Sequence, residues 1–523
     1  MNRSRPGFIL WVLCGILFLE YIYIFSFLLN YHFCYMQEEN IRTGTWALGD
    51  GKALRWDDWA RSLNIDRIEL DPYRITRPIS DFCQVLDAKF RANCWNFIPP
   101  HPALSLYWPL YFIGIPLLMF RFFRNMGCYP TVSLGGVCLY LSSIGFLGPI
   151  LMFFHPGKGL VNFLTIWSLF LTSLIYREVS KLEGRVSFAE VPHFGAYFAA
   201  LLFSVFMTFF CDETGLFVFA IIGVFWVPLF LRLKEWRMIL FCALLLPLGY
   251  FLAIHFFLPY LHLMVRGVHI NLGHCEMFPH ISGVFLQNLC TNYVWLFADY
   301  PHLYMKITNL ITNKPFAILQ LFYISGTVFV LVLFFKAIFW DGPKSRLAPI
   351  AGCMILLILF VLFHTILMSS FGQTWGVWYY GSLFPLIYYV LLVLIMQFIL
   401  EGRYGGIFKN LFIFIIAVTA LFSMISTTCR FDQFHANHQV QVGLRCAKEE
   451  IFGGDAGEYF KQFSFKYSLE NSHCRYLYTV SKWSQVKQKK IAAISQETID
   501  HCKGLLAKDM DFIDETKYLD VEL

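Results

Sequence analysis

Charged residues are scarce in this sequence. Only 15% of its 523 residues are Asp, Glu, Lys or Arg, whereas water-soluble domains carry about 25%. Hydrophobic residues make up 57% of the chain and aromatic residues 19%. A water-soluble fold could not bury so much apolar surface, so the composition excludes an ordinary soluble domain and indicates that the lipid bilayer is the solvent.

Three signatures of other protein classes are missing as well. The 15 cysteines include no C-x-x-C pair, so their spacing gives no metal-site signature. No basic run alternates with stacking aromatic residues, so we expect no nucleic-acid partner despite the net charge of +6. The chain has no internal repeat and no matched Gly/Pro-broken helices, which argues against an inverted-repeat transporter.

Long apolar stretches are present instead, several of about 18 or more residues without a charge, enough to cross a hydrocarbon core about 30 Å thick. We predict an all-α polytopic membrane protein with about eleven transmembrane helices. The first span has no small-residue cleavage site before Tyr31, so we interpret it as a retained helix rather than a signal peptide. The predicted spans are 7–30, 103–122, 130–153, 159–176, 193–211, 215–231, 238–258, 315–335, 347–368, 377–400 and 409–427.

The distribution of Lys and Arg predicts the orientation, because short basic loops stay on the cytoplasmic side. The short connections on the opposite side offer only Lys158. The N-terminus is therefore predicted to be cytoplasmic and the C-terminus extracytoplasmic. Alternate connections collect Arg3, Arg5, Arg121, Arg124, Arg177, Lys181, Arg185, Arg232, Lys234, Arg237, Lys336, Lys344, Arg346, Arg403 and Lys409.

Three long polar segments fall on the extracytoplasmic side and are expected to carry the function, because a short turn would suffice to connect helices. They are the loops 31–102 and 259–314 of a transmembrane domain (1–427), and a small C-terminal domain (428–523) with helical character near its end. Disulfides are chemically allowed there, although the spacing of the cysteines does not determine which of them pair.

The first long loop brings acidic and basic residues close together. Asp57 and Asp58 stand between two tryptophans, and Arg74 and Arg77 follow. A carboxylate pair could hold a divalent cation, Mg²⁺ or Mn²⁺, or deprotonate an acceptor hydroxyl, while arginines could bind a phosphate. The same carboxylates also fit a helix start at Trp59, with Asp57 as its cap and Asp58 facing its dipole.

The order of these features resembles the opening of the GT-C membrane glycosyltransferases: a first helix, an acidic loop motif, then Arg77-Pro78-Ile79-Ser80-Asp81-Phe82-Cys83-Gln84-Val85-Leu86-Asp87. In that superfamily an acidic residue of the first extracytoplasmic loop is the usual catalytic centre, and an Arg-Pro or Lys-Pro element follows it. The resemblance implies a catalytic role for Asp57 or Asp58, with Glu38 and Glu39 as reserve candidates near the first helix.

Later motifs are similar to the same superfamily. Phe153-Phe154-His155-Pro156-Gly157-Lys158, interpreted as the end of the third helix, looks like a Phe-x-x-His-Pro element of the protein O-mannosyltransferase-like and aminoarabinose-transferase-like groups. Cys211-Asp212-Glu213-Thr214-Gly215 is similar to a Lys-Glu-Thr-Ala element, with Asp212 in place of the usual Lys. Trp378–Pro385 resembles a late Arg-Tyr element but lacks the Arg. His155 and Asp212-Glu213 could equally be helix-terminal residues.

The resemblance covers about residues 1–400 and implies a transferase that passes a sugar from a polyprenyl-phosphate donor to a lipid, glycan or protein acceptor on the extracytoplasmic face. Arg74, Arg77 and Lys158 would neutralise the departing phosphate. The expected location is the cytoplasmic (inner) membrane of a bacterium, with the endoplasmic reticulum left open. A lipid-linked glycan polymerase or ligase and a transporter are the alternative functions.

Overall fold

The structure is a computed structural model that describes the greater part of the predicted helices. Within the described residues every regular element is helical and no strand occurs, which confirms the all-α prediction. The described residues are 8–30, 78–95, 105–143, 145–147, 156–182, 188–211, 215–233, 235–266, 347–370, 383–401 and 495–507, with Phe285, Phe414, Ile416, Ala417, Val418, Ala420, Met424 and Cys474.

Two short π-helical segments occur: η2 (Leu110–Gly114) leads into α6 (Ile115–Asn125), and η5 (Ala253–Phe257) links α12 (Trp236–Leu252) to α13 (Leu258–Arg266). One further short element, η3 (Phe188–Glu190), is a 3-10 turn. In chain order the elements are α1 (Phe8–Asn30), α5 (Pro78–Trp95), η2 (Leu110–Gly114), α6 (Ile115–Asn125), α7 (Pro130–Leu141), α9 (Pro156–Lys181), η3 (Phe188–Glu190), α10 (Phe194–Phe209), α11 (Leu216–Arg232), α12 (Trp236–Leu252), η5 (Ala253–Phe257), α13 (Leu258–Arg266), α17 (Leu347–Ser370), α19 (Leu383–Glu401) and α24 (Gln496–Leu506).

Three of the described helices are long and apolar enough to cross a membrane, at Phe8–Ser26, Gly157–Lys181 and Trp236–Leu261. Five shorter helices are also apolar, at Pro130–Leu141, Phe194–Phe209, Phe217–Leu231, Leu347–Phe360 and Leu386–Glu401. Most of the span formed by α12, η5 and α13 has large apolar side chains on its surface, such as Leu244 and Phe256. That is the surface expected of a helix that faces lipid.

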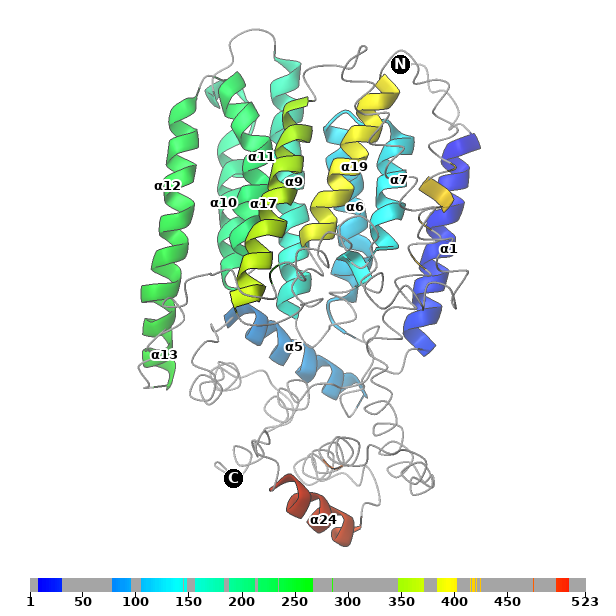
Figure 1. Ribbon diagram of the computed structural model, residues 1–523, viewed down its shortest axis with the longest axis vertical. Helices are drawn as coiled ribbons and strands as arrows, with labels where there is room; N and C mark the ends of the chain where they lie inside the picture. Colours follow the sequence, from blue (N-terminus) through cyan, green and yellow to red (C-terminus); the bar gives the residue numbers. More distant parts are fainter. Residues whose placement is uncertain are drawn as a thin grey trace.

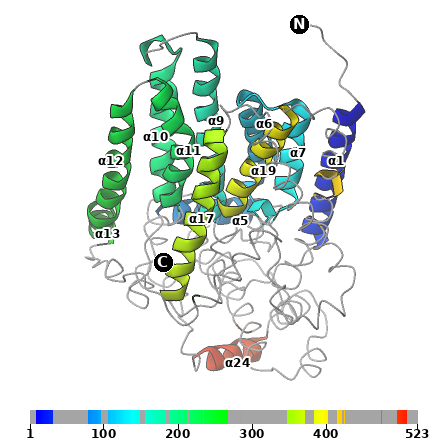
Figure 2. The same cartoon turned by 45° about the horizontal axis from the view of Figure 1, so that its top comes forward.

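The apolar helices stand side by side, and α5 lies across one end of the bundle, with α24 beyond it (Figures 1 and 2). The central helix α9 packs against α6, α10 and α11, while α1 packs against α7. Aromatic side chains fill the middle, including the fully buried Phe122, Tyr140, Phe225 and Tyr389. Because α5 crosses the bundle rather than joining it, its contacts gather at the ends of several helices.

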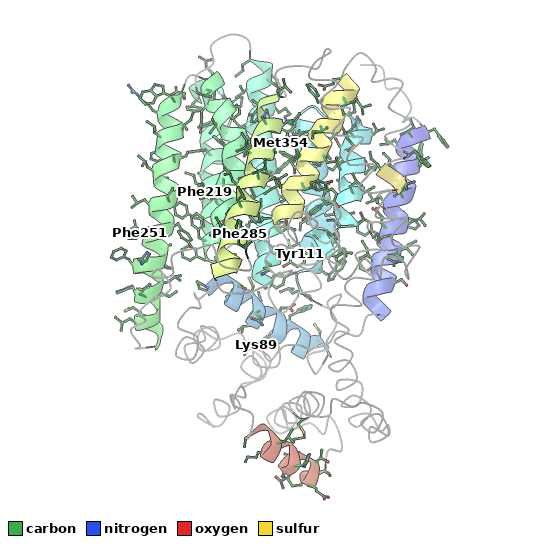
Figure 3. The ribbon with its side chains drawn as sticks, viewed as in Figure 1. Lys89, Tyr111, Phe219, Phe251, Phe285 and Met354 are labelled. Atoms are coloured by element: carbon green, nitrogen blue, oxygen red, sulfur yellow. A yellow bond between two sulfur atoms is a disulfide. The ribbon has the colours of Figure 1, made fainter. Side chains whose placement is uncertain are left out.

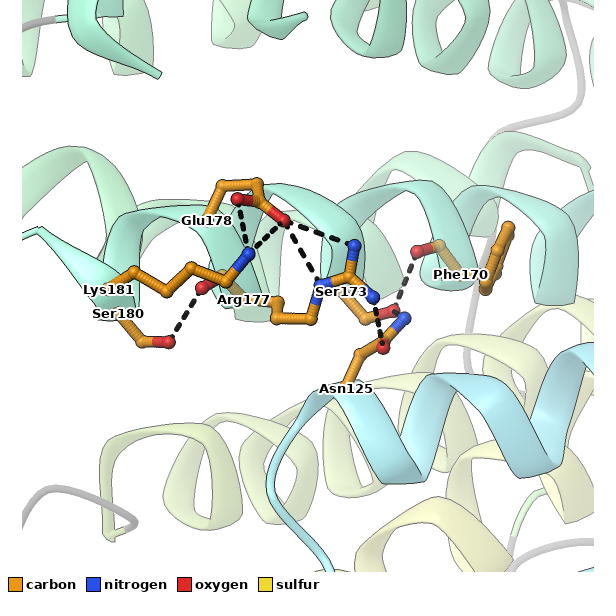
Figure 4. A network of polar contacts seen from close by, with 7 residues as sticks. All are labelled: Asn125, Phe170, Ser173, Arg177, Glu178, Ser180 and Lys181. Atoms are coloured by element: carbon orange, nitrogen blue, oxygen red, sulfur yellow. Dashed lines mark hydrogen bonds and ion pairs between the residues drawn. The ribbon is translucent and has the colours of Figure 1, made fainter. Parts of the chain in front are cut away.

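The opposite end of the bundle carries a network of charged and polar side chains from α6 and α9 (Figure 4). Glu178 pairs with Lys181 at 2.7 Å and with Arg177 at 3.1 Å. Arg177 also donates to Asn125 at 3.4 Å, and Asn125 donates to Ser173 at 3.1 Å. These basic residues belong to the set from which a cytoplasmic face is predicted.

Several predicted spans match helices closely. Spans 7–30, 193–211, 215–231 and 347–368 correspond to α1, α10, α11 and α17. Span 315–335 lies outside the described residues, and within 409–427 the described residues, Phe414 to Met424 with gaps, are helical. The helical character predicted near the chain end is confirmed for Gln496–Leu506.

Two predictions about the region between the second and fourth spans are wrong. The predicted helix 130–153 is not continuous, because α7 ends at Leu141. The Ser142 hydroxyl donates to the Leu139 carbonyl at 2.9 Å and Ser143 to Tyr140 at 2.7 Å, competing with the helical pattern. Pro156 does not end a helix either. It begins α9, because a proline lacks the N–H that a first helical residue leaves unused.

Candidate functional site

Of the site residues predicted from the sequence, Lys158 is described. Residues directly beside several of the others are also described, since Pro78, Pro156 and Cys211 adjoin Arg77, His155 and Asp212 in the chain. The predicted site residues Asp57, Asp58, Glu38, Glu39, Arg74, Arg77, His155, Asp212 and Glu213 lie outside the described residues.

The start of α5 contacts the end of α10. The Ile79 backbone N–H donates to the Phe210 carbonyl at 3.2 Å. Helix α5 begins at Pro78 because proline is favoured in the first helical turn and disfavours a helical conformation in the residue before it. The Arg-Pro motif therefore determines where α5 starts and which residues meet α10.

The start of α9 contacts the same place. The Gly157 N–H donates to the Ser80 hydroxyl oxygen at 3.0 Å, and Ser80 is only 4% exposed. This is a helix cap supplied by another helix, because the first N–H groups of α9 have no carbonyl partner within it. A Cβ atom on Gly157 would lie 2.2 Å from the Cys211 carbonyl oxygen and 2.7 Å from the Ser80 hydroxyl oxygen. Only glycine allows so close an approach.

The second half of α5 holds the segment that leads into α6. Asp87, buried at 3% exposure, accepts from the Ser105 hydroxyl at 2.9 Å and from the Leu106 N–H at 2.6 Å. The Tyr107 hydroxyl donates to the Cys83 carbonyl at 2.7 Å. In Figure 3, Lys89 lies on α5 and Tyr111 at the end of the bundle above it. Helix α5 is thus held at its start and near its middle.

We call the meeting point of Pro78–Ser80, Pro156–Lys158 and Phe210–Cys211 the α5 junction. Lys158 stands in the first turn of α9, where the helix dipole favours negative charge, and is 4% exposed.

The junction therefore unites the described parts of three motifs that the sequence places far apart: Arg77-Pro78, His155–Lys158 and Cys211–Gly215. Sequence reasoning missed the roles of Ser80, Asp87 and Gly157, although all three stand within the motifs quoted above. A serine two residues after an Arg-Pro element is a weak signal for a cap. The close approach of Gly157 to Cys211 has no signal in the sequence.

Among the described residues no group of three or more His, Cys, Asp or Glu side chains could hold a metal ion. The predicted late motif Trp378–Pro385 is described only from Leu383, where α19 begins. A disulfide joins Cys474 to Cys502 of α24, a pairing that the spacing of the cysteines did not determine. No protein family model, no curated protein sequence and no solved structure matches the chain.

Proposed function

We propose that the chain is a multi-pass membrane glycosyltransferase of the GT-C type. It transfers a sugar from a polyprenyl-phosphate donor to a lipid, glycan or protein acceptor on the extracytoplasmic face. About eleven transmembrane helices carry the long extracytoplasmic loops and the C-terminal domain. The membrane assignment is supported by the three helices that are long and apolar enough to cross a bilayer.

The observation that carries the proposal is the α5 junction. The resemblance predicted functional roles for Arg77-Pro78, His155–Lys158 and the segment after Cys211 independently of one another, and described residues within or directly beside all three make contact with each other. Ile79 bonds to Phe210, and Ser80 bonds to Gly157. Because consecutive Cα atoms are only about 3.8 Å apart, Arg77 and His155 are tethered to the junction by single peptide bonds.

Each predicted residue has one role in the proposal. Asp58 or Asp57 is the general base for the acceptor hydroxyl, with Glu38 and Glu39 in reserve. The donor phosphate is bound and neutralised as it leaves by Arg74, Arg77 and Lys158, while His155, Asp212 and Glu213 border the same site. A divalent cation, Mg²⁺ or Mn²⁺, would add positive charge at the phosphate if the carboxylates hold one.

Donor turnover in membranes that contain the full-length chain tests the proposal. The substrates are polyprenyl phosphates carrying a radiolabelled hexose or pentose, and the measurement is transfer of label to lipid, glycan and protein fractions, with and without a chelator. Asp57→Asn or Asp58→Asn should lower the rate by about 10² to 10⁴ at unchanged expression, since loss of a general base has that effect. Arg77→Lys should be intermediate, because a point charge survives but bidentate contact does not.

A purely structural role for the two aspartates predicts a different result. Asparagine caps a helix almost as well as aspartate, so both variants would then keep near-normal turnover. Full turnover by Asp57→Asn and Asp58→Asn would move the catalytic assignment to Glu38 or Glu39. Full turnover by Gln variants at those positions as well would refute the hypothesis that this loop supplies the catalytic carboxylate of a glycosyltransferase.

Orientation needs its own test. Reporter fusions at Arg124 and Arg237 should lie in the cytoplasm, and fusions after Asn271 and Asp455 should lie outside, because basic residues gather on the cytoplasmic side. A cytoplasmic reporter after Asn271 would put the loop 259–314 on the wrong side for an extracytoplasmic reaction.

A further inference from the structure

Helix α1 carries one charged residue, Glu20, near the middle of an otherwise apolar helix of 23 residues. Its side chain is 1% exposed. Leu13 and Ile24 are also buried, whereas Phe18 and Ile22 are exposed at 65% and 50%. Glu20 therefore lies on the inward face of α1, which packs against α7, and not on the face toward lipid.

Neither carboxyl oxygen of Glu20 has a hydrogen-bond partner within the described part of the chain. Among the described residues, the Cys138 thiol of α7 is the one side-chain donor that interacts with the carboxyl, and its Sγ atom also donates to the Leu13 carbonyl oxygen at 3.9 Å. The neighbouring Tyr21 hydroxyl donates instead to the Phe112 carbonyl of η2. The carboxyl is thus buried with a thiol, a weak donor, as the one described group that could stabilise a negative charge on it.

The described elements packed around Glu20 carry no cationic side chain. Neither α7 nor η2 contains a charged residue, and the described residues between Phe414 and Met424 are all apolar. The other titratable groups on α1, η2 and α7 are Cys14, Tyr21, Tyr23, Tyr111, Cys138 and Tyr140, none of which is basic. An ionised carboxylate at this depth would be an isolated buried charge, the most costly kind of group in a membrane.

We propose that Glu20 is an intramembrane proton-binding site whose carboxyl is protonated at neutral pH. The proposal rests on the surroundings of Glu20 in the seam between α1 and α7, and it does not depend on the glycosyltransferase assignment. No other acidic side chain in the described helices combines this burial with two oxygens that lack hydrogen-bond partners.

Infrared difference spectroscopy on the full-length chain in lipid nanodiscs tests the protonation state. The spectrum of wild type minus Glu20→Gln at neutral pH should contain the C=O stretch of a protonated carboxyl without hydrogen bonds. Glu178→Gln is the control, because Glu178 lies in ion pairs with Lys181 and Arg177 and its difference spectrum should contain carboxylate bands. Carboxylate bands for Glu20, in sodium or in choline buffer, would overturn the proposal.

Discussion

Substitution of Gly157 by alanine tests the α5 junction most directly. The added Cβ would lie 2.2 Å from the Cys211 carbonyl oxygen, whereas real Cβ contacts are essentially never below 3.0 Å. The obstacle is backbone, so the start of α9 must move by about 1 Å. Forced overpacking of this kind costs about 1–3 kcal/mol. The same movement would weaken the hydrogen bond from Gly157 to Ser80, worth about 1 kcal/mol.

The matched control is Gly223→Ala, in the middle of α11. A Cβ at Gly223 meets nothing within 4 Å, so the variant should gain helix stability of about 0.5–1 kcal/mol. The two substitutions add the same methyl group to a helix and should have opposite signs. The free energy of unfolding, measured by denaturant titration in mixed micelles, should fall for Gly157→Ala and rise or stay constant for Gly223→Ala.

A second substitution separates the two contacts of the added methyl group. Adding Ser80→Ala to Gly157→Ala removes the contact with the hydroxyl but not the shorter one with the Cys211 carbonyl, so it should not restore stability. Donor turnover should also fall by about 10² for Gly157→Ala, since a displacement of about 1 Å has that effect on catalytic geometry. Wild-type stability of Gly157→Ala would refute the close contact between α9 and α10.

Three further results are expected elsewhere in the chain. Asp87→Ala should lower the free energy of unfolding by about 1–3 kcal/mol, because it leaves the buried donors of Ser105 and Leu106 without an acceptor; a melting temperature equal to wild type would contradict this role. Cys502→Ser opens a loop of sequence separation 28 and should cost the C-terminal segment about 3–4 kcal/mol, seen as faster proteolysis near α24 with unchanged melting of the bundle. Arg177→Ala should change stability by less than about 1 kcal/mol, because its ion pair with Glu178 is exposed on the arginine side; a larger loss would mean that the network in Figure 4 acts as a unit.

The sequence predicted the helices best where a long apolar run is bounded by basic residues. Span 7–30 contains α1, whose apolar run from Phe8 to Ser26 is long enough to cross a membrane. Prediction was poorer at Ser142 and Ser143, whose hydroxyls bond to backbone carbonyls and end α7 early. Serine is tolerated inside membrane helices, so its presence alone does not mark an end.

The candidate site was predictable in its parts but not in its contacts. The order of the motifs along the chain and their predicted side of the membrane singled out the segments around Arg77, Lys158 and Cys211. The sequence pattern alone does not show that Ser80 contacts Gly157. Glu20 was missed for a different reason. One carboxyl hardly changes the mean hydropathy of a long apolar span, so the span is predicted as a membrane helix with or without it. An acidic residue inside such a span is nevertheless a strong indication of a functional site.

The cap that Ser80 provides for α9 has a consequence for the order of events during synthesis. Gly157 follows Ser80 by 77 residues, so at about 5–20 residues per second the ribosome reaches Gly157 about 4–15 seconds after it has made Ser80. During that interval α5, which is too polar to span the bilayer, would lie at the membrane surface with the Ser80 hydroxyl in water. The junction can close only after α9 has been inserted, so it is a late step of maturation, and a chain stalled before Pro156 would expose α5 to proteases and chaperones.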